Sequence, residues 1–242
     1  MQLDEYQRMY EAERTHFWFR GTRAIVFDQV RGLTGRALEV ADIGCGTGGT
    51  LVQMPANWTA TGVDTSSDAL KFAKSRGNAR LVRGNATDLP LSTAAFDLAF
   101  ALDVIEHCDE DLAAARELAR ILKAGGVLVT TVPAFQFLFG PHDVALAHRR
   151  RYRRAQFGGL LRSAGFHIEK LSYFNALLFP PSAAVRLAAK LARSRRPSKS
   201  DADPLPRLVN EVLFRVFASE RSVLRSWNLP IGLSLLAVAR RA

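Results

Sequence analysis

Cysteine is scarce in this chain of 242 residues, which contains only Cys45 and Cys108. The two are not spaced as Cys-x-x-Cys, so the sequence indicates neither a disulfide framework nor a zinc site, and we expect a reducing, cytoplasmic location. Long apolar runs are missing as well, since none approaches the roughly 18 residues that cross a bilayer. The opening MQLDEYQRMYEAERTHFWFR is charged throughout and lacks the apolar segment of a signal peptide. These absences argue against disulfide-stapled and membrane-spanning proteins.

Acidic residues are fewer than basic ones: 23 Asp and Glu against 33 Lys and Arg give a formal charge of +10. The excess gathers in HRRRYRR (148–154) and RLAAKLARSRRPSK (186–199). Such density predicts an acidic partner, namely a phosphorylated substrate, an anionic lipid surface or nucleic acid, unless the arginines form a solvated face. The second cluster is amphipathic, so it predicts either a peripheral membrane contact or a helix that covers the substrate.

Strands and helices are expected to alternate from residue 37 onward. The predicted strands are 37–43, 59–64, 79–85, 96–103 and 127–133, and the predicted helices begin at Thr50 (TLVQM) and span 66–77 and 109–126. This alternation is typical of a parallel sheet covered by helices on both faces.

The pattern loosens after Pro133. A helix is predicted at 153–166, a strand at 167–174, a helix at 207–226 and a last strand at 233–241. Between them, Pro180 and Pro181 break an apolar stretch, and the Pro- and Ser-rich residues 194–206 predict a mobile linker. We therefore predict a single domain. It comprises a helical cover (1–36), a core (37–174), a helical insertion (175–230) and a last strand (231–242).

The glycine-rich stretch ADIGCGTGGT (41–50) fits two ligand-binding patterns. Counting to Gly49 it spells G-x-G-x-x-G, which is typical of dinucleotide sites, whereas counting to Gly48 it spells a tighter G-x-G-x-G. Both patterns place glycines after the first strand, where backbone must approach the ligand closely. The glycines alone therefore leave the ligand open.

The acidic residue before the glycines separates the two interpretations. Asp42 ends a buried strand, and a buried carboxylate is costly unless a cation or a hydrogen-bond donor accompanies it. A ligand with an ammonium group would supply that partner, whereas a pyrophosphate would be repelled. Asp64, at the end of the second strand, is placed to accept hydrogen bonds from ribose hydroxyls in either case. The sequence thus favours an amino-acid-bearing nucleoside over NAD, and it contains no Tyr-x-x-x-Lys pair of a dehydrogenase.

Four stretches together resemble the successive motifs of class I S-adenosylmethionine (SAM) dependent methyltransferases, in matching order over about residues 37–135. They are ALEVADIGCGTGG, TGVDTS, RGNATDLPLSTAAFDLAFALDVIEHCDED and LKAGGVLVTTVPA. The resemblance implies a Rossmann-like α/β fold: seven mostly parallel strands, helices on both faces and an antiparallel last strand. It also implies SAM as the cofactor and S-adenosylhomocysteine as the product.

The same resemblance implies a set of cofactor contacts. The methionine part of SAM is expected against the glycine loop, the ribose on the second-strand acid, and the adenine beside the next residue and the third strand. The usual Gly-Asp-Ala after that strand is Gly-Asn-Ala here, so Asn85 brings an amide in place of a carboxylate. The implied residues are Asp42, Gly44, Gly46, Gly48, Asp64, Thr65, Asn85, Ala86 and Asp103, with Arg23 expected to meet the methionine carboxylate.

Both ends of the chain extend the resemblance. Three further stretches are similar to a subgroup of bacterial methyltransferases of small molecules or glycolipids. They are HFWFRGTR near the start, the segment with HDVALAHRRRY after the fifth strand, and the closing ERSVLRSWNLPIGLSLLAVARR. That similarity covers nearly the whole chain.

Three histidines are candidates for the general base. Methyl transfer from a sulfonium is an in-line displacement that needs no metal, but a hydroxyl acceptor gains about 10²–10⁴-fold from a base. His107 follows the fourth strand, while His142 and His148 follow the fifth, so all three are expected at the ligand-binding edge of the sheet. His107 could instead hold its loop. Arg149 or Arg150 could grip an anionic group beside Tyr152, or these side chains could remain solvated.

The sequence therefore predicts a SAM-dependent methyltransferase of a small-molecule, saccharide or lipid-linked acceptor, with oxygen favoured as the methylated atom and an anionic acceptor in view of the charge. Two alternatives stay open. A nucleic-acid methyltransferase is opposed by ALDVIE after the fourth strand, where Asn/Asp-Pro-Pro-aromatic is absent, and by the lack of a stacking platform. The second alternative is a protein that binds SAM but catalyses no reaction. The identity of the acceptor and the oligomeric state are left undetermined.

Overall fold

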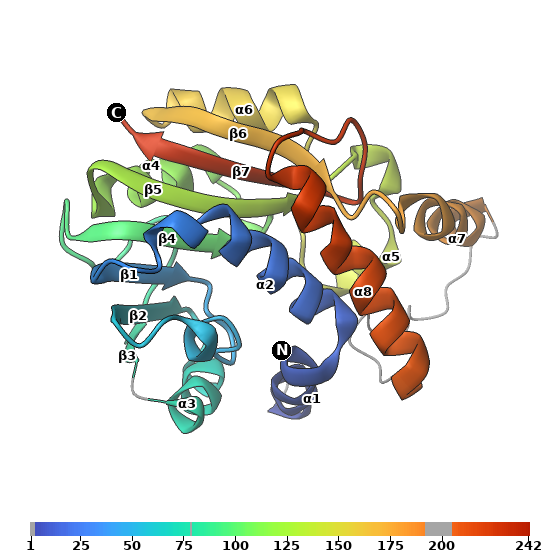
Figure 1. Ribbon diagram of the computed structural model, residues 1–242, viewed down its shortest axis with the longest axis horizontal. Coiled ribbons are helices and arrows are strands. Elements are labelled where there is room, and N and C mark those ends of the chain that lie inside the picture. Colours follow the sequence, from blue (N-terminus) through green and yellow to red (C-terminus); the bar gives the residue numbers. More distant parts are fainter. Residues whose placement is uncertain (1–2, 78, 192–204) are drawn as a thin grey trace.

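The computed structural model describes residues 3–77, 79–191 and 205–242. Seven strands form one sheet in the order β3-β2-β1-β4-β5-β7-β6 (Figure 1). They are β1 (Leu38–Ile43), β2 (Trp58–Asp64), β3 (Arg80–Arg83), β4 (Phe96–Leu102), β5 (Leu122–Pro133), β6 (Phe166–Phe174) and β7 (Ser234–Arg241). β7 runs antiparallel to both β5 and β6, and the other neighbouring pairs are parallel. The predicted Rossmann-like sheet with an antiparallel last strand is confirmed.

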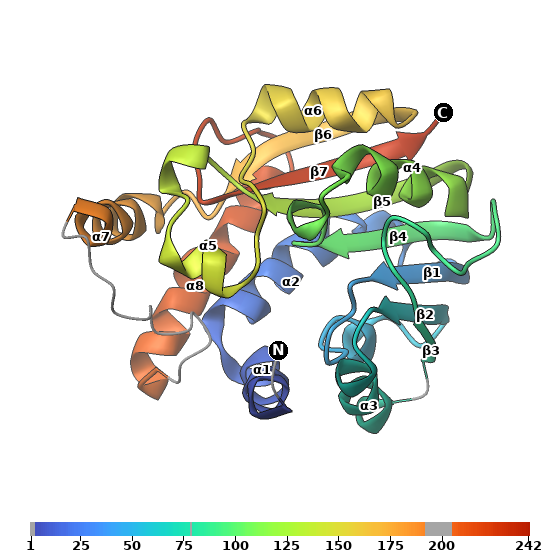
Figure 2. The same cartoon turned by 180° about the vertical axis from the view of Figure 1, so that it is seen from behind.

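Helices cover both faces of the sheet, because side chains alternate along each buried strand. In β1, Val40 belongs to the hydrophobic cluster under α2 (Phe17–Gln29) and α8 (Arg207–Leu224). Its neighbour Ala41 belongs to the opposite cluster, under α4 (Asp111–Ile121) and α6 (Arg154–Ser163). Figure 1 shows α2 and α8 in front of the sheet, and Figure 2 shows α4 and α6 from behind.

The helix α1 (Leu3–Thr15) covers the glycine loop and packs against both α2 and α3 (Ser67–Arg76). Its buried Glu13 carboxylate accepts hydrogen bonds from Thr47 Oγ1 at 2.5 Å and from Arg76 at 2.8 Å. The Arg76 guanidinium also donates to the Tyr10 carbonyl and lies 4.0 Å from the centre of the Tyr10 ring. One arginine thus fixes α1 to the loop and to α3.

Two predicted helices are shorter than expected. The helix predicted from Thr50 is a single 3₁₀ turn at Leu51–Gln53, because Met54 must be extended (ψ 143°) before Pro55. The helix predicted to 126 ends at Ile121. The following LKAGG forms an irregular start of β5, in which Phe96 pairs with Leu122 but Leu98 pairs with Val127.

The helical insertion also differs from its prediction in one respect. Pro180 and Pro181 do not break the apolar stretch but lie in the first turn of α7 (Phe179–Leu191), where a missing N–H costs no helical hydrogen bond. Residues 192–204 lie outside the described residues, and they include 194–204 of the predicted mobile linker 194–206. Within the described ranges, no helix combines the length and the apolar character needed to cross a membrane.

Candidate functional site

A cavity of about 760 Å³ opens at the carboxyl ends of the parallel strands, between the helices α1 and α2 and the segment that follows β5. All of the predicted site residues except Gly48 line it. They are Arg23, Asp42, Gly44, Gly46, Asp64, Thr65, Asn85, Ala86, Asp103, His107, His142 and His148. Cofactor candidates and histidine candidates therefore share one cavity, although they come from six separate segments of the chain.

The glycines of the loop differ in what they do. Gly46 has a φ of +53° and lines the cavity under α1, where a Cβ would lie 2.7 Å from the Met9 methyl carbon. Gly48 has a φ of +84° and faces α3 instead, where a Cβ would lie 3.0 Å from Ala73. The loop thus needs Gly46 beside the ligand and Gly48 for close packing of loop and helix.

Asp42 is a buried carboxylate with an unsatisfied hydrogen-bond acceptor. It is 2% exposed, and its Oδ2 atom has no hydrogen-bond partner in the described part of the chain. Burial, together with the charges of Glu13 and Asp64, raises its pKa well above the ordinary value. Three carboxylates at one end of a cavity favour a cationic ligand and oppose a pyrophosphate. An ammonium or sulfonium group fits this end, as the sequence predicts for the methionine part of SAM.

Asp64 is held in place by the backbone that surrounds it. Its Oδ2 accepts from the Gly46 amide and its Oδ1 from the Ser66 amide, each at 2.9 Å. A carboxylate oxygen has two lone pairs, so each oxygen retains one for a ribose hydroxyl. The same contacts also fix the shape of the glycine loop.

We expect Asp64→Ala to weaken the binding of S-adenosylhomocysteine about tenfold or more, because charge-assisted hydrogen bonds to the ribose are lost. Isothermal titration calorimetry measures this directly. Asp68→Ala is the matched control, since Asp68 does not line the cavity and its carboxylate pairs with Lys71 on the surface. Equal affinity of both variants would contradict the assignment of Asp64 to the ribose.

Asn85 and Asp103 line the cavity with side chains that already have partners. The Asn85 Oδ1 atom accepts from the Thr87 amide at 3.1 Å, so one lone pair remains for an adenine amino group. Asp103, in the left-handed region with φ +53°, accepts from Thr131 Oγ1 at 3.0 Å. Their roles toward the cofactor stay predictions.

Arg23 is a buried cation at the edge of the cavity. It is 4% exposed and donates to the Glu13 carbonyl. Its Nε also lies 3.0 Å from the Gln53 side-chain oxygen when the Gln53 amide is turned so that the oxygen, and not the nitrogen, faces Arg23. Burial lowers its pKa to about 10, which leaves the guanidinium charged at neutral pH. It therefore remains available to a carboxylate.

On the other side of the cavity, His148 is oriented by a buried aspartate. Its Nδ1 lies 2.9 Å from Oδ1 of Asp143, in the short helix α5 (Pro141–Ala145). Asp143 also accepts from Arg151 Nε at 2.7 Å and from the Gly140 amide at 2.9 Å. Although burial opposes ionisation, the hydrogen bonds from His148 and Arg151 lower the pKa of Asp143 below its ordinary value.

A charged Asp143 selects the tautomer of His148. The proton stays on Nδ1, so Nε2 carries the lone pair, as in a base oriented by a carboxylate. The His107 ring stands nearly perpendicular to that of His148, with centroids 4.8 Å apart. His107 is exposed at the cavity, but desolvation by the surrounding protein and the charge of His148 lower its pKa to about 4, so His107 is neutral at pH 7. His142 lines the same rim from α5.

Glu106 is fully buried, and its Oε1 atom lies 4.0 Å from Nε2 of His148. Neither carboxylate oxygen has a hydrogen-bond partner among residues 3–77, 79–191 and 205–242, and burial together with Asp103 raises its pKa well above the ordinary value. Glu106, His107 and His148 each offer one potential metal-ligand atom, and these three atoms lie within 4.8 Å of one another. Such side chains can hold a transition metal, so the metal-free reaction expected from the sequence remains a prediction.

We expect Glu106→Gln to raise the free energy of unfolding, and we expect this difference from the wild type to increase with pH. An acid whose folded-state pKa is raised binds its proton more tightly in the native state, so the wild type loses stability as pH rises above about 4.5. The amide has no such dependence, and each tenfold change in proton affinity is worth about 1.4 kcal/mol. Urea unfolding at pH 5 and pH 8 measures the difference. Glu110→Gln, at an exposed position, should show no gain, and an equal gain there would contradict the explanation.

The basic run after α5 is arranged differently from the hypothesis that Arg149 or Arg150 faces the acceptor. Arg149 pairs with Asp109 at 3.1 Å, while Arg150 and the Tyr152 hydroxyl contact Asp111 at 3.0 and 2.9 Å, and neither arginine lines the cavity. Arg151 lines the cavity instead. An irregular segment has no side-chain periodicity, so no sequence signal distinguishes these arginines.

Comparison with known proteins agrees with this geometry. Residues 41–130 match the family model described as "Methyltransferase domain". An O-methyltransferase of Aspergillus nomiae is 32% identical over 102 residues, which cover 38% of this chain and 45% of the relative. A probable SAM-dependent methyltransferase of Mycolicibacterium smegmatis is 29% identical over 158 residues, covering 64% and 61%. The chain thus spans less than two thirds of these relatives.

Solved structures share the fold. A SAM-dependent methyltransferase of Thermotoga maritima, described as a possible histamine N-methyltransferase, has a TM-score of 0.61 at 18% identity, covering 99% of this chain and 96% of its own. A SAM-dependent methyltransferase of Archaeoglobus fulgidus has a TM-score of 0.59 at 18% identity, covering 91% and 93%.

Proposed function

We propose that this chain, an enzyme of the methyltransferase class with SAM as its cofactor, methylates a hydroxyl group of a small-molecule, saccharide or lipid-linked acceptor. The observation that carries the proposal is the Asp143–His148 pair, which shares one cavity with Asp42 and Asp64. Bound SAM would supply a methyl group on a positively charged sulfur. The residues of the chain must then hold the acceptor in line with that group and remove its proton.

His148 is the general base in this proposal. Its Nε2 atom takes the proton of the acceptor hydroxyl, and Asp143 stabilises the resulting imidazolium through Nδ1. Such base catalysis contributes about 10²–10⁴-fold, whereas orientation of the two reactants contributes roughly 7–11 kcal/mol. His107 is neutral and lies beside His148, so it does not repel a proton on His148.

Oxygen is the proposed acceptor atom for two reasons. A hydroxyl needs a base to become a good nucleophile at neutral pH, and this cavity contains an oriented histidine. The Aspergillus relative is also an O-methyltransferase by its description. Arg151 and Arg186 line the same part of the cavity, which supports an acceptor with an anionic group.

Apolar side chains at the cavity mouth support an acceptor with a lipid part. Leu146 lines the cavity and is 37% exposed, and the nearby Val144 is 66% exposed. From α7, Val185 and Leu187 are also exposed, and Arg186 reaches to within 3.8 Å of Asp143 in α5, so the two helices meet at the mouth (Figure 2). Apolar residues beside arginines are typical of peripheral contact with an anionic membrane, which we include in the proposal.

Methyl transfer from radiolabelled SAM to matched acceptors tests the proposal. The panel contains saccharides with and without a lipid anchor, each as the hydroxyl compound and as its amine analogue. We expect labelled methyl ethers, formed faster from anchored acceptors in the presence of anionic vesicles. Labelling of the amines alone would overturn the assignment to oxygen. Addition of EDTA should leave turnover unchanged, and loss of activity would assign a metal to Glu106, His107 and His148.

A further inference from the structure

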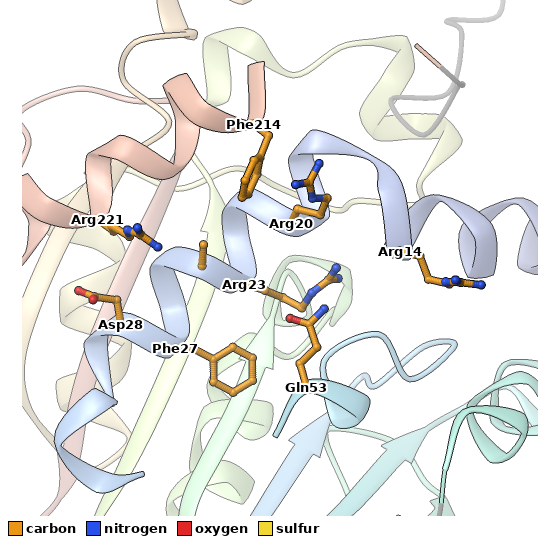
Figure 3. Close-up of a pocket in the computed structure, with 9 residues that line it drawn as sticks. Arg14, Arg20, Arg23, Phe27, Asp28, Gln53, Phe214 and Arg221 are labelled. Atoms are coloured by element: carbon orange, nitrogen blue, oxygen red, sulfur yellow. The ribbon is translucent and has the colours of Figure 1, made fainter. Parts of the chain in front are cut away.

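A second hollow, of about 530 Å³, lies outside the cofactor cavity along one side of α2 (Figure 3). We call it the arginine groove. The lining of the groove comes from α1, α2, the 3₁₀ turn after the glycine loop, and α8. It consists of Arg14, Arg20, Arg23, Ala24, Phe27, Asp28, Gln53, Phe214 and Arg221. Four arginines and one acid in so small a hollow leave an excess of positive charge.

The charges at one end of the groove are incompletely neutralised. Arg14 has no carboxylate within ion-pair distance in the described ranges, and Arg23 has only neutral hydrogen-bond acceptors, the Glu13 carbonyl and the Gln53 amide. Arg20 pairs with Glu211 at 3.0 Å, but that carboxylate is shared with Arg215 at 3.2 Å. Burial lowers the pKa of Arg23, the Glu13 carboxylate raises it, and the charges of Arg76 and Arg20 lower it further, so Glu13 offsets the positive charge of Arg23 only in part.

The one acidic residue of the groove does not neutralise this excess of positive charge. Asp28 accepts from Arg225 Nε at 2.9 Å and lies toward the opposite end, beside Arg221 (Figure 3). Between the two ends lie the rings of Phe27 and Phe214, and the Arg20 guanidinium stacks 3.8 Å from the centre of the Phe214 ring. The groove therefore combines a cationic end with an aromatic middle.

We propose that the arginine groove binds a phosphorylated small molecule, with the phosphate at the end lined by Arg14, Arg20 and Arg23 and an apolar or planar part against Phe27 and Phe214. Guanidinium groups present paired donors that match phosphate oxygens, and a phosphate offers more acceptor oxygens than a carboxylate. The hollow is larger than one phosphate, and its remaining lining is apolar. The groove lies outside the cofactor cavity but shares Arg23 with it.

Calorimetric titration with inorganic pyrophosphate at low salt tests this site. We expect one binding event per chain, weakened about tenfold in Arg14→Gln/Arg20→Gln, because two of the three phosphate contacts are lost. The affinity for S-adenosylhomocysteine should not change, since neither residue lines the cofactor cavity. Arg14→Gln alone, at an exposed position, keeps the test valid if the double variant does not fold.

The matched control is Arg116→Gln/Arg162→Gln, which removes the same charge from exposed positions on α4 and α6, across the sheet. Retained affinity in this control supports the site. No binding of pyrophosphate at millimolar concentration, or an equal loss in the control, would overturn it. Vesicles containing phosphatidic acid form a second arm. Binding that is lost with Arg14→Gln/Arg20→Gln identifies a lipid headgroup as the source of the phosphate, whereas pyrophosphate binding alone identifies a soluble compound.

Discussion

Replacement of His148 by alanine should lower turnover about 10²–10⁴-fold, the range that a general base contributes. The variant loses the Nε2 lone pair that Asp143 keeps free of a proton. The affinity for S-adenosylhomocysteine should stay within about threefold of the wild type, because His148 lies on the acceptor side of the cavity. Steady-state kinetics with saturating SAM, together with calorimetry, separate the two quantities.

Two further histidine variants make that result specific. His107→Ala should lower turnover less than His148→Ala, since the His107 ring is held by the backbone of Ala147 and Asp103, whereas His148 is oriented by the carboxylate of Asp143. His167→Ala, at an exposed position on β6, should have no effect. Wild-type turnover in His148→Ala would return His148 to a structural role, and a greater loss in His107→Ala would transfer the role of base to His107.

Arg76→Met should lower the free energy of unfolding by about 3–5 kcal/mol, because it leaves the Glu13 carboxylate buried without its cation. The side chains of Arg76 and Glu13 are only 6% and 7% exposed, and they connect α1 to the glycine loop. Urea unfolding measures the loss of stability. The affinity for S-adenosylhomocysteine should fall as well, since α1 forms part of the cavity wall.

The double variant Glu13→Gln/Arg76→Met distinguishes a broken ion pair from lost packing. Removing both charges avoids an uncompensated buried carboxylate, so much of the stability should return. If the double variant is as unstable as Arg76→Met, the ion pair is not the cause. The surface pair of Lys71 and Asp68 serves as a comparison, because Lys71→Met should change stability by less than about 1 kcal/mol.

The order of elements in the core was predictable because strand and helix patterns in it are local. The prediction failed where a proline beside the element or a strand partner distant in sequence decides the conformation. Pro55 prevents the helix after the glycine loop, and the pairing of Phe96 with Leu122 draws LKAGG into β5. Pro180 and Pro181 mark the start of a helix as readily as a break. Local patterns alone do not distinguish these outcomes.

Some cavity residues could likewise be predicted from local sequence patterns, and others could not. Asp42 and Asp64 were predictable because their places at strand ends are set by the motif that contains them. Asp143, Glu106 and Arg151 were missed, because their importance depends on burial and on partners from other segments. A carboxylate next to a candidate histidine, as in His142-Asp143, is the one local signal that could have drawn attention to the pair.

The position of β7 has a consequence for the order in which the chain can fold during synthesis. β7 follows β5 and β6 in the sequence, yet it lies between them in the sheet and forms hydrogen bonds with both. Until it emerges, β6 has no neighbour in the sheet and β5 presents a long open edge that can pair with other nascent chains. Most of the ligand-binding half can assemble early, whereas the sheet is complete only when β7 has been synthesised.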